Sequence, residues 1–288
     1  MSEQPALNAP PQYLVIGHIT QDLQPDRSFR LGGTATYSAL TAAKLGLTVG
    51  VLTSTNGHIA PFADMPWVVV HQRPALQTTI FENIYIGSHR KQYIRALAEV
   101  LTASDLLPGW ERAPIVHIGP VCQEVAEDLI DAFPRSLLGI TPQGFLRRWD
   151  AEGLVSPTAW QNADRLLERA DVIVLSLPDL GGDQEQLAYY VRKARLLVLT
   201  IGANGAIVYQ RGEPTHVPAY EVVEVDPTGA GDTFAAAFFI RYYETGDALE
   251  AARFANCVAS FCVEGVGASN LPTRQQVEHR LRYGRLRH

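Results

Sequence analysis

A short segment rich in glycine and acidic residues is the part of this sequence best suited to chemistry. It reads Asp226-Pro-Thr-Gly-Ala-Gly-Asp232 and is followed by a stretch with helical character. Small residues at a helix N-terminus let an anion approach the backbone N–H groups, and the helix dipole favours negative charge there. The segment therefore predicts a cradle for a phosphoryl group in transfer.

Asp232 is the unexpected residue in a loop that should bind anions. Beside such a cradle, its carboxylate can accept the proton of an attacking hydroxyl as a general base. The alternative is that Asp232 only caps the helix, a role that Asp favours. For a bare G-x-G-D string the cap is the better explanation, so the choice depends on the rest of the chain.

The elements around this loop indicate an α/β domain. Apolar, β-branched runs predict strands at 13–17, 48–53, 68–70, 115–119, 137–141, 171–175 and 196–201, and helices are expected at 34–45 and near 123–133, 158–169 and 183–194. Strands that alternate with helices and are apolar throughout predict a mainly parallel sheet covered on both faces. With no repeat and no low-complexity linker, we expect one domain over residues 1–288.

One stretch departs from this alternation. Between Leu76 and Ala96, side chains alternate in character around Gly87, which predicts a hairpin with one wet face. In an α/β domain such a hairpin is a candidate lid over the site, although a peripheral hairpin or edge strand explains it equally well. Only nine residues separate Asp22 from Gly32, and they can supply little more than one strand. We expect a reduced lid from about 23–33 and 76–96.

The bulk properties exclude several classes of protein. The formal net charge is −6, whereas a nucleic-acid binder usually carries a basic stripe. No apolar run is long enough to span a membrane, and no secretory signal precedes the first strand, so we expect a cytoplasmic protein. The arginines near the end of the sequence (Arg280, Arg282, Arg285, Arg287) are interpreted as a solvated helix end, and the three cysteines (Cys122, Cys257, Cys262) as buried thiols.

The complete run DPTGAGD-T-F resembles the second signature of the ribokinase-like (PfkB) family of sugar and nucleoside kinases. The resemblance implies an anion hole formed by Gly229, Ala230 and Gly231, with Asp232 as the catalytic base. It also implies the ribokinase-like fold, a three-layer sandwich with a mainly parallel central sheet and a small β lid. ATP and Mg²⁺ are the expected cofactors.

Further landmarks of the family appear in order on the acceptor side. Asp22 follows the first strand at the family's spacing, and a carboxylate can accept two polyol hydroxyls side by side. The pair Gly32-Gly33 opens a helix as in the first family signature. Tyr37 stands where the family usually has Asn, so a ring and a phenol replace an amide. We include Tyr37 in the expected substrate pocket and expect a pocket unlike that of a simple ribokinase.

On the nucleotide side, the resemblance assigns ATP binding to Thr200, Gly202 and Gly205 of a Thr-x-Gly-x-x-Gly turn. Asn256 is expected to border the adenine. Thr228, within the signature loop, completes this expected set.

Two metal assignments come from the same resemblance. Asp179, in Ser176-Leu-Pro-Asp179, takes the place of the family's Asn-x-x-Glu and is expected to hold Mg²⁺ through water. Asp226, with the Thr228 carbonyl and the loop Gly265–Ser269, matches a site for a monovalent cation such as K⁺.

The acceptor is narrowed by a run that starts at Gln143 and includes Arg147. Gln-Gly-Phe-Leu-Arg after a strand resembles the myo-inositol kinase branch of the family, which also has a short lid. We therefore expect a small sugar or cyclitol acceptor, with ribose, fructose-type sugars, nucleosides and a catalytically silent binding protein as alternatives. The first strand lacks the G-x-G-x-x-G of dinucleotide enzymes, and no P-loop is present. A monomer and a homodimer both remain open.

Overall fold

A computed structural model describes residues 9–57, 62–86 and 89–287 of the chain. Its centre is a sheet of nine strands in the order β15 (Glu213–Val217), β14 (Ala206–Gln210), β13 (Leu196–Thr200), β12 (Val172–Ser176), β9 (Leu137–Ile140), β8 (Ile115–Ile118), β1 (Tyr13–Ile16), β4 (Val49–Thr55) and β5 (Val68–Pro74). From β13 to β5 all neighbours are parallel, and β14 and β15 add antiparallel strands at one edge. The predicted mainly parallel sheet is confirmed.

Alternate side chains of the strands enter two separate cores, one on each face of this sheet. In β1, Tyr13 and Val15 join one core while Leu14 and Ile16 join the other, and all four are fully buried. A parallel strand that is covered on both faces must be apolar throughout, which is why the sequence shows continuous apolar runs. The sheet and its two helical layers form the three-layer sandwich.

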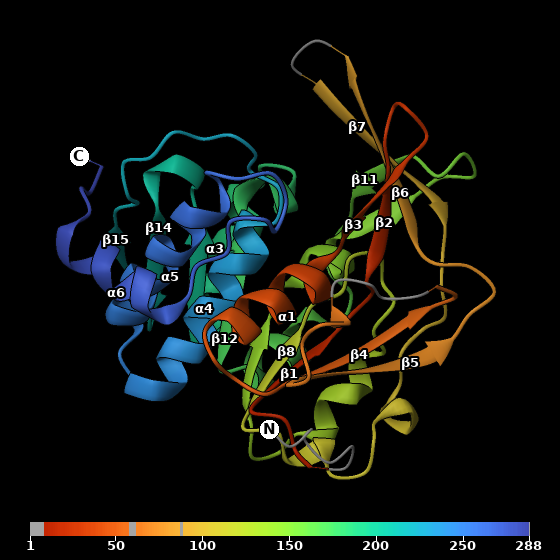
Figure 1. Ribbon diagram of the computed structural model, residues 1–288, viewed down its shortest axis with the longest axis horizontal. Helices are drawn as coiled ribbons and strands as arrows, with labels where there is room; N and C mark the ends of the chain where they lie inside the picture. The colour runs from red at the N-terminus through yellow and green to blue at the C-terminus, as the bar shows by residue number, and fades with distance from the viewer. Residues whose placement is uncertain (1–8, 58–61, 87–88, 288) are drawn as a thin grey trace.

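The helices divide between these layers. Helices α1 (Thr34–Lys44), α4 (Ala230–Thr245), α5 (Ala248–Cys262) and α6 (Arg274–Tyr283) contribute to the core of Tyr13, and α2 (Ala163–Arg169) and α3 (Gln184–Lys193) contribute to the core of Leu14. Figure 1 shows α1, α4, α5 and α6 grouped beside the sheet. No described helix is long and apolar enough to cross a membrane.

Two helix predictions were too long. Near 123–133 only a short 3₁₀ helix, Glu127–Ala132, is present, because Val125 is held extended in a bridge to Leu101. In the segment 158–169 the helix starts at Ala163, because Asn162 has a left-handed backbone with φ of 55°. Such a backbone interrupts a right-handed helix.

A separate small sheet rises from one end of the main body (Figure 1). Its order is β3 (Phe29–Gly32), β2 (Thr20–Leu23), β6 (Ile80–Ile86) and β7 (His89–Ala96), and β6 and β7 form the predicted hairpin. The tip at Gly87 lies outside the described residues. The nine residues between Asp22 and Gly32 supply only the last residue of β2 and the first three of β3, as expected. Strand β2 itself begins at Thr20, before Asp22. The role of this small sheet as a lid stays a prediction. A third pair, β10 (Arg147–Trp149) and β11 (Val155–Pro157), lies beside β7.

The close contact between β9 and α4 generates a stability prediction. A Cβ added at Gly139 would lie 2.5 Å from the Phe239 ring, which is itself fully buried. We expect Gly139→Ala to lower the free energy of unfolding by about 1–3 kcal/mol through overpacking, measured by urea denaturation. The control is Gly57→Ala, since a Cβ at Gly57 meets only ordinary contacts, the nearest at 3.7 Å. Equal stability of the two variants would contradict this account of the contact.

Candidate functional site

The loop before α4 is shaped by one glycine. Gly229 has φ of 77° and caps α4 in the left-handed region, and a Cβ added there would lie 2.1 Å from the Tyr37 ring. The backbone angle and the close ring both require glycine at this position. Other residues disfavour a positive φ, and no side chain fits between the loop and the Tyr37 ring. Tyr37 is buried and therefore forms the floor on which the loop rests.

Asp232 lies in the first turn of α4 and is partly buried in the wall of a cavity. Burial raises the pKa of this carboxyl to about 6, and nearby Asp179 adds to the increase. A hydrogen bond from the Thr34 side chain and the charge of Arg147 act in the opposite direction. A carboxyl with a pKa close to neutral suits a general base better than a helix cap.

A buried polar network supports this turn from below. The Ser38 hydroxyl donates to the backbone oxygen of Asp232 at 3.3 Å, and Ser38 also bonds the hydroxyl of Tyr13. That hydroxyl meets Nδ1 of His117 at 2.8 Å, and Nε2 of His117 meets the Thr141 hydroxyl at 2.9 Å. Burial lowers the pKa of His117 to about 3, so the ring is neutral. The network positions Asp232 and brings no charge near it.

A cavity of about 750 Å³ opens on the Asp232 side of the loop. Five of the six residues that we assigned to the acceptor line it: Asp22, Gly33, Tyr37, Gln143 and Arg147. Asp232, the assigned base, also lies in its wall. Gly229, Asp226 and Thr228 also line this cavity. We call it the acceptor cavity. Segments more than 200 residues apart in sequence thus meet at one space.

The two glycines that open α1 bring the backbone close to Asp22 and β1. A Cβ at Gly32 would lie 2.7 Å from Oδ2 of Asp22, and one at Gly33 would lie 2.3 Å from the His18 carbonyl oxygen. Gly33 also has φ of 86°. Gly32 does not itself line the acceptor cavity but makes room for the Asp22 carboxylate that does.

Asp179 does not line the acceptor cavity, nor the second cavity that is described in the next paragraph. Its Oδ2 accepts from the backbone N–H and hydroxyl of Ser176 as a helix cap, at 2.8 and 2.7 Å, and its Oδ1 accepts from Nε2 of Gln143 at 3.0 Å. Since Oδ1 accepts only one of these hydrogen bonds and has a second lone pair, Asp179 can still bind the water shell of Mg²⁺. The expected Mg²⁺ role fits these contacts and stays a prediction.

A second, narrower cavity of about 140 Å³ lies on the other side of the loop. It is lined by Ala230 and Gly231 of the loop and by the four residues predicted to bind ATP outside it: Thr200, Gly202, Gly205 and Asn256. We call it the donor cavity. Thr228 faces the acceptor cavity instead, and Pro227 lines both. The amide of Asn256 donates to the carbonyls of Val217 and Pro218 at 2.9 and 3.1 Å, so Asn256 also holds the wall together.

The residues expected at a monovalent cation site lie close together. Asp226 accepts from the N–H groups of Thr228 and Gly267, each at 3.0 Å. Burial raises the pKa of this carboxyl, but the hydrogen bonds and Arg30 outweigh it, so the pKa lies below its usual value. The buried thiol of Cys262 points to the carbonyls of Thr228 and Gly267, at 3.7 and 3.9 Å. The cation site stays a prediction.

Several lining residues were missed by sequence reasoning. The acceptor cavity includes Arg30, Thr34, Phe81, Asn83 and Gln92. The alternation along β6 predicted that Phe81 and Asn83 share a face but not which space they enter. Asn83 accepts from Gln92 across the hairpin at 3.1 Å. The register between β6 and β7, which sequence alone does not give, creates this pair.

The interpretation of the last arginines as a solvated helix end was wrong for Arg280. Arg280 lies 3.4 Å above the Phe261 ring and pairs with Glu264 at 2.7 Å. Arg287 lies beyond α6 and lines the donor cavity. The three cysteines are buried, as predicted.

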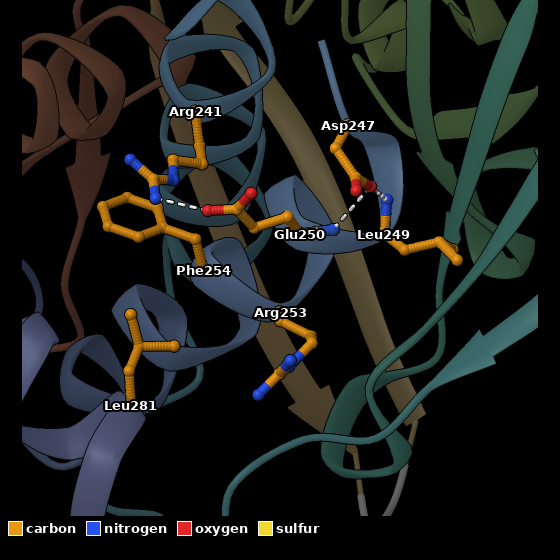
Figure 2. Close-up of a pocket in the computed structure, with 7 residues that line it drawn as sticks. All are labelled: Arg241, Asp247, Leu249, Glu250, Arg253, Phe254 and Leu281. Carbon is orange, nitrogen blue, oxygen red and sulfur yellow. Dashed lines mark hydrogen bonds and ion pairs between the residues drawn. The ribbon is translucent and has the colours of Figure 1, made fainter. Parts of the chain in front are cut away.

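Two other features of the described chain carry no assigned chemistry. The buried cluster of His18, Cys122 and Glu124 has ligand types within 4.8 Å of one another, but both His18 nitrogens and the Glu124 carboxylate already bond to protein groups. A groove of about 450 Å³ over α4 and α5 is drawn in Figure 2. There Arg241 forms an ion pair with Glu250, and Asp247 caps α5. These three charged side chains therefore have structural partners.

Comparisons with known proteins agree with this geometry. The sequence profile of the "pfkB family carbohydrate kinase" matches residues 151–274. Ribokinase of Bacillus subtilis is 42% identical over 98 residues, a segment that covers 34% of this chain and 32% of the ribokinase, or about a third of that relative. Fructokinase of Escherichia coli is 26% identical over 309 residues, and this match covers 92% of this chain and 97% of the fructokinase.

Solved structures share the fold over nearly the whole chain. A pyrophosphate-dependent kinase in the ribokinase family, complexed with a pyrophosphate analog and myo-inositol, superposes with a TM-score of 0.77 at 25% identity. The match covers 93% of this chain and 99% of that one. The expected ribokinase-like fold is confirmed.

The raised pKa of Asp232 generates a prediction about stability. A carboxyl whose folded-state pKa exceeds its unfolded value costs folding free energy once it ionises, so this cost appears as the pH rises from about 4 through about 6. Asp232→Asn removes the cost. We expect the Tm of this variant, relative to the unmodified protein, to be higher at pH 8 than at pH 4. A difference that is independent of pH would contradict the raised pKa, and Asp128→Asn, at an exposed position, serves as the control.

Proposed function

We propose that the chain, whose residues 151–274 match the profile of the pfkB family of carbohydrate kinases, transfers the γ-phosphoryl group of ATP to a hydroxyl of a small sugar or cyclitol. One observation carries this proposal. Asp232, with a pKa of about 6, stands in the wall of the acceptor cavity at the loop whose other side lines the donor cavity. The acceptor hydroxyl and the donor phosphate therefore have one meeting point, which lies beside a base.

Asp232 acts as the general base in this proposal. At neutral pH its carboxylate is largely ionised, and it accepts the proton of the acceptor hydroxyl as the oxygen attacks phosphorus. Thr34 donates to the carboxylate and keeps it oriented. Asp22, across the cavity, accepts from other hydroxyls of the acceptor and fixes which hydroxyl reaches Asp232.

The loop backbone serves the phosphoryl group. Negative charge develops on the equatorial oxygens during transfer, and the N–H groups at the start of α4 are oriented toward that charge before the reaction begins. Gly229, Ala230 and Gly231 are the residues that we assign to this anion hole. Mg²⁺, held through water by Asp179, would neutralise part of the phosphate charge.

The lining of the acceptor cavity favours a polyol. Asp22, Asn83, Gln92 and Gln143 supply acceptors and donors around the space. Tyr37 packs under Gly229 and offers no amide to the acceptor. Among acceptors we place myo-inositol first, since the similar solved kinase is complexed with myo-inositol, and keep ribose, fructose-type sugars and nucleosides as alternatives.

The assignment of the base is tested by Asp232→Asn. We expect kcat to fall about 10²–10⁴-fold, the usual contribution of a general base, while binding of an ATP analogue changes little. Turnover is measured by coupled ADP release, and the fold is checked by the Tm. Turnover near that of the unmodified protein would remove Asp232 from the mechanism.

The acceptor is tested by a screen of myo-inositol, ribose, fructose, 2-keto-3-deoxygluconate and adenosine. We expect the highest kcat/KM with myo-inositol, because the polar groups around the cavity match a ring with hydroxyls on all sides. Preference for adenosine would contradict the cyclitol assignment and leave the kinase assignment intact. Binding of an acceptor and ATP without any product would instead favour a silent binding protein.

A further inference from the structure

The segment Gly284–Arg287, which follows α6, turns back onto the wall of the donor cavity. Arg285 accepts from the backbone N–H of Glu221 at 2.9 Å, and the N–H of Arg287 donates to Ala219 at 2.8 Å. Between these bonds, Leu286 forms an antiparallel bridge with Tyr220, which is buried. Two main-chain hydrogen bonds thus hold the backbone of Arg287 in place, and its side chain is exposed.

The donor cavity is poor in charge. Among the residues that line it, only Glu224 and Arg287 are charged, and most of the others are small or apolar, such as Ala203, Ala259 and Val263. No hydrogen bond or ion pair joins the side chain of Arg287 to another described residue. A cationic side chain with five donors is therefore available at the wall of an apolar slot.

The size and lining of this cavity bear on which donor fits. At about 140 Å³ it is smaller than a whole ligand site, which is usually at least about 300 Å³, so it encloses one end of a donor only. Pyrophosphate is charged throughout and gains nothing from an apolar slot. A nucleoside triphosphate has an apolar, planar end for the slot and phosphates that can extend past Gly231 toward Asp232.

We propose that Arg287 is a donor-specificity residue, whose guanidinium contacts the nucleoside end of a nucleoside triphosphate in the donor cavity. The inference rests on the proposed function and adds a residue to it. A planar guanidinium can stack on a base or donate to its ring atoms and to ribose oxygens. Arg287 lies beyond residues 151–274, the part that matches the family profile, so that match assigns it no role.

The test compares Arg287→Ala with Arg285→Ala, a matched control in the same segment whose side chain does not line the cavity. We expect Arg287→Ala to raise the KM for ATP and the Kd of a non-hydrolysable ATP analogue about 5–30-fold, the range of a cation–π or guanidinium contact. Neither kcat nor the KM for the acceptor should change. The KM and Kd of Arg287→Lys should lie between those of Arg287→Ala and those of the unmodified protein. Arg285→Ala should match the unmodified protein in both constants.

Pyrophosphate provides the second arm of the test. We expect it to support turnover poorly and to show no dependence on Arg287. Equal KM and Kd for ATP in the Arg287→Ala variant and the unmodified protein would overturn the inference, as would a preference for pyrophosphate over ATP. Failure of the unmodified protein to phosphorylate any acceptor would count against the proposed function instead, and Kd of the ATP analogue would still decide the role of Arg287.

Discussion

The site depends on a partly buried carboxyl group at the positive end of a helix. Asp232 lies in the first turn of α4, where N–H groups favour an anion, yet burial favours its protonated form and raises its pKa to about 6. The group is therefore held close to the point at which it can exchange a proton near neutral pH. Thr34 contacts the carboxyl group and Ser38 the backbone of the same residue, both from α1. The packing of α1 against α4 thus keeps this carboxyl group in place.

The same turn separates two spaces with different chemistry. The acceptor cavity carries carboxylates, amides and arginines, whereas the donor cavity is narrow and mostly apolar. Gly229 faces the first, and Ala230 and Gly231 face the second. A phosphoryl group held at this loop would lie between the two cavities. Small residues are needed because Tyr37 leaves no space beneath the loop.

Much of the fold was readable because the central strands are buried on both faces. Apolar runs, such as Tyr13–Ile16, have few alternatives to a parallel sheet, and the signature loop has a fixed relation to the helix that follows. Prediction failed where backbone conformation or distant pairing decides the outcome. Asn162 delays α2 by its left-handed backbone, and Val125 pairs with Leu101 in place of a helix. Neither effect has a periodic pattern in sequence.

The sequence by itself determined which loop we propose for the chemistry, Asp226 to Asp232, because small residues and a carboxylate at a helix start are a local pattern. Tertiary structure alone decided what surrounds that loop. It placed Arg147 and Asp179 near enough to Asp232 to change its pKa, put Tyr37 under the glycine, and returned Arg287 to the donor cavity. Charges and rings act through distances across the fold, and such distances depend on packing between elements far apart in the chain.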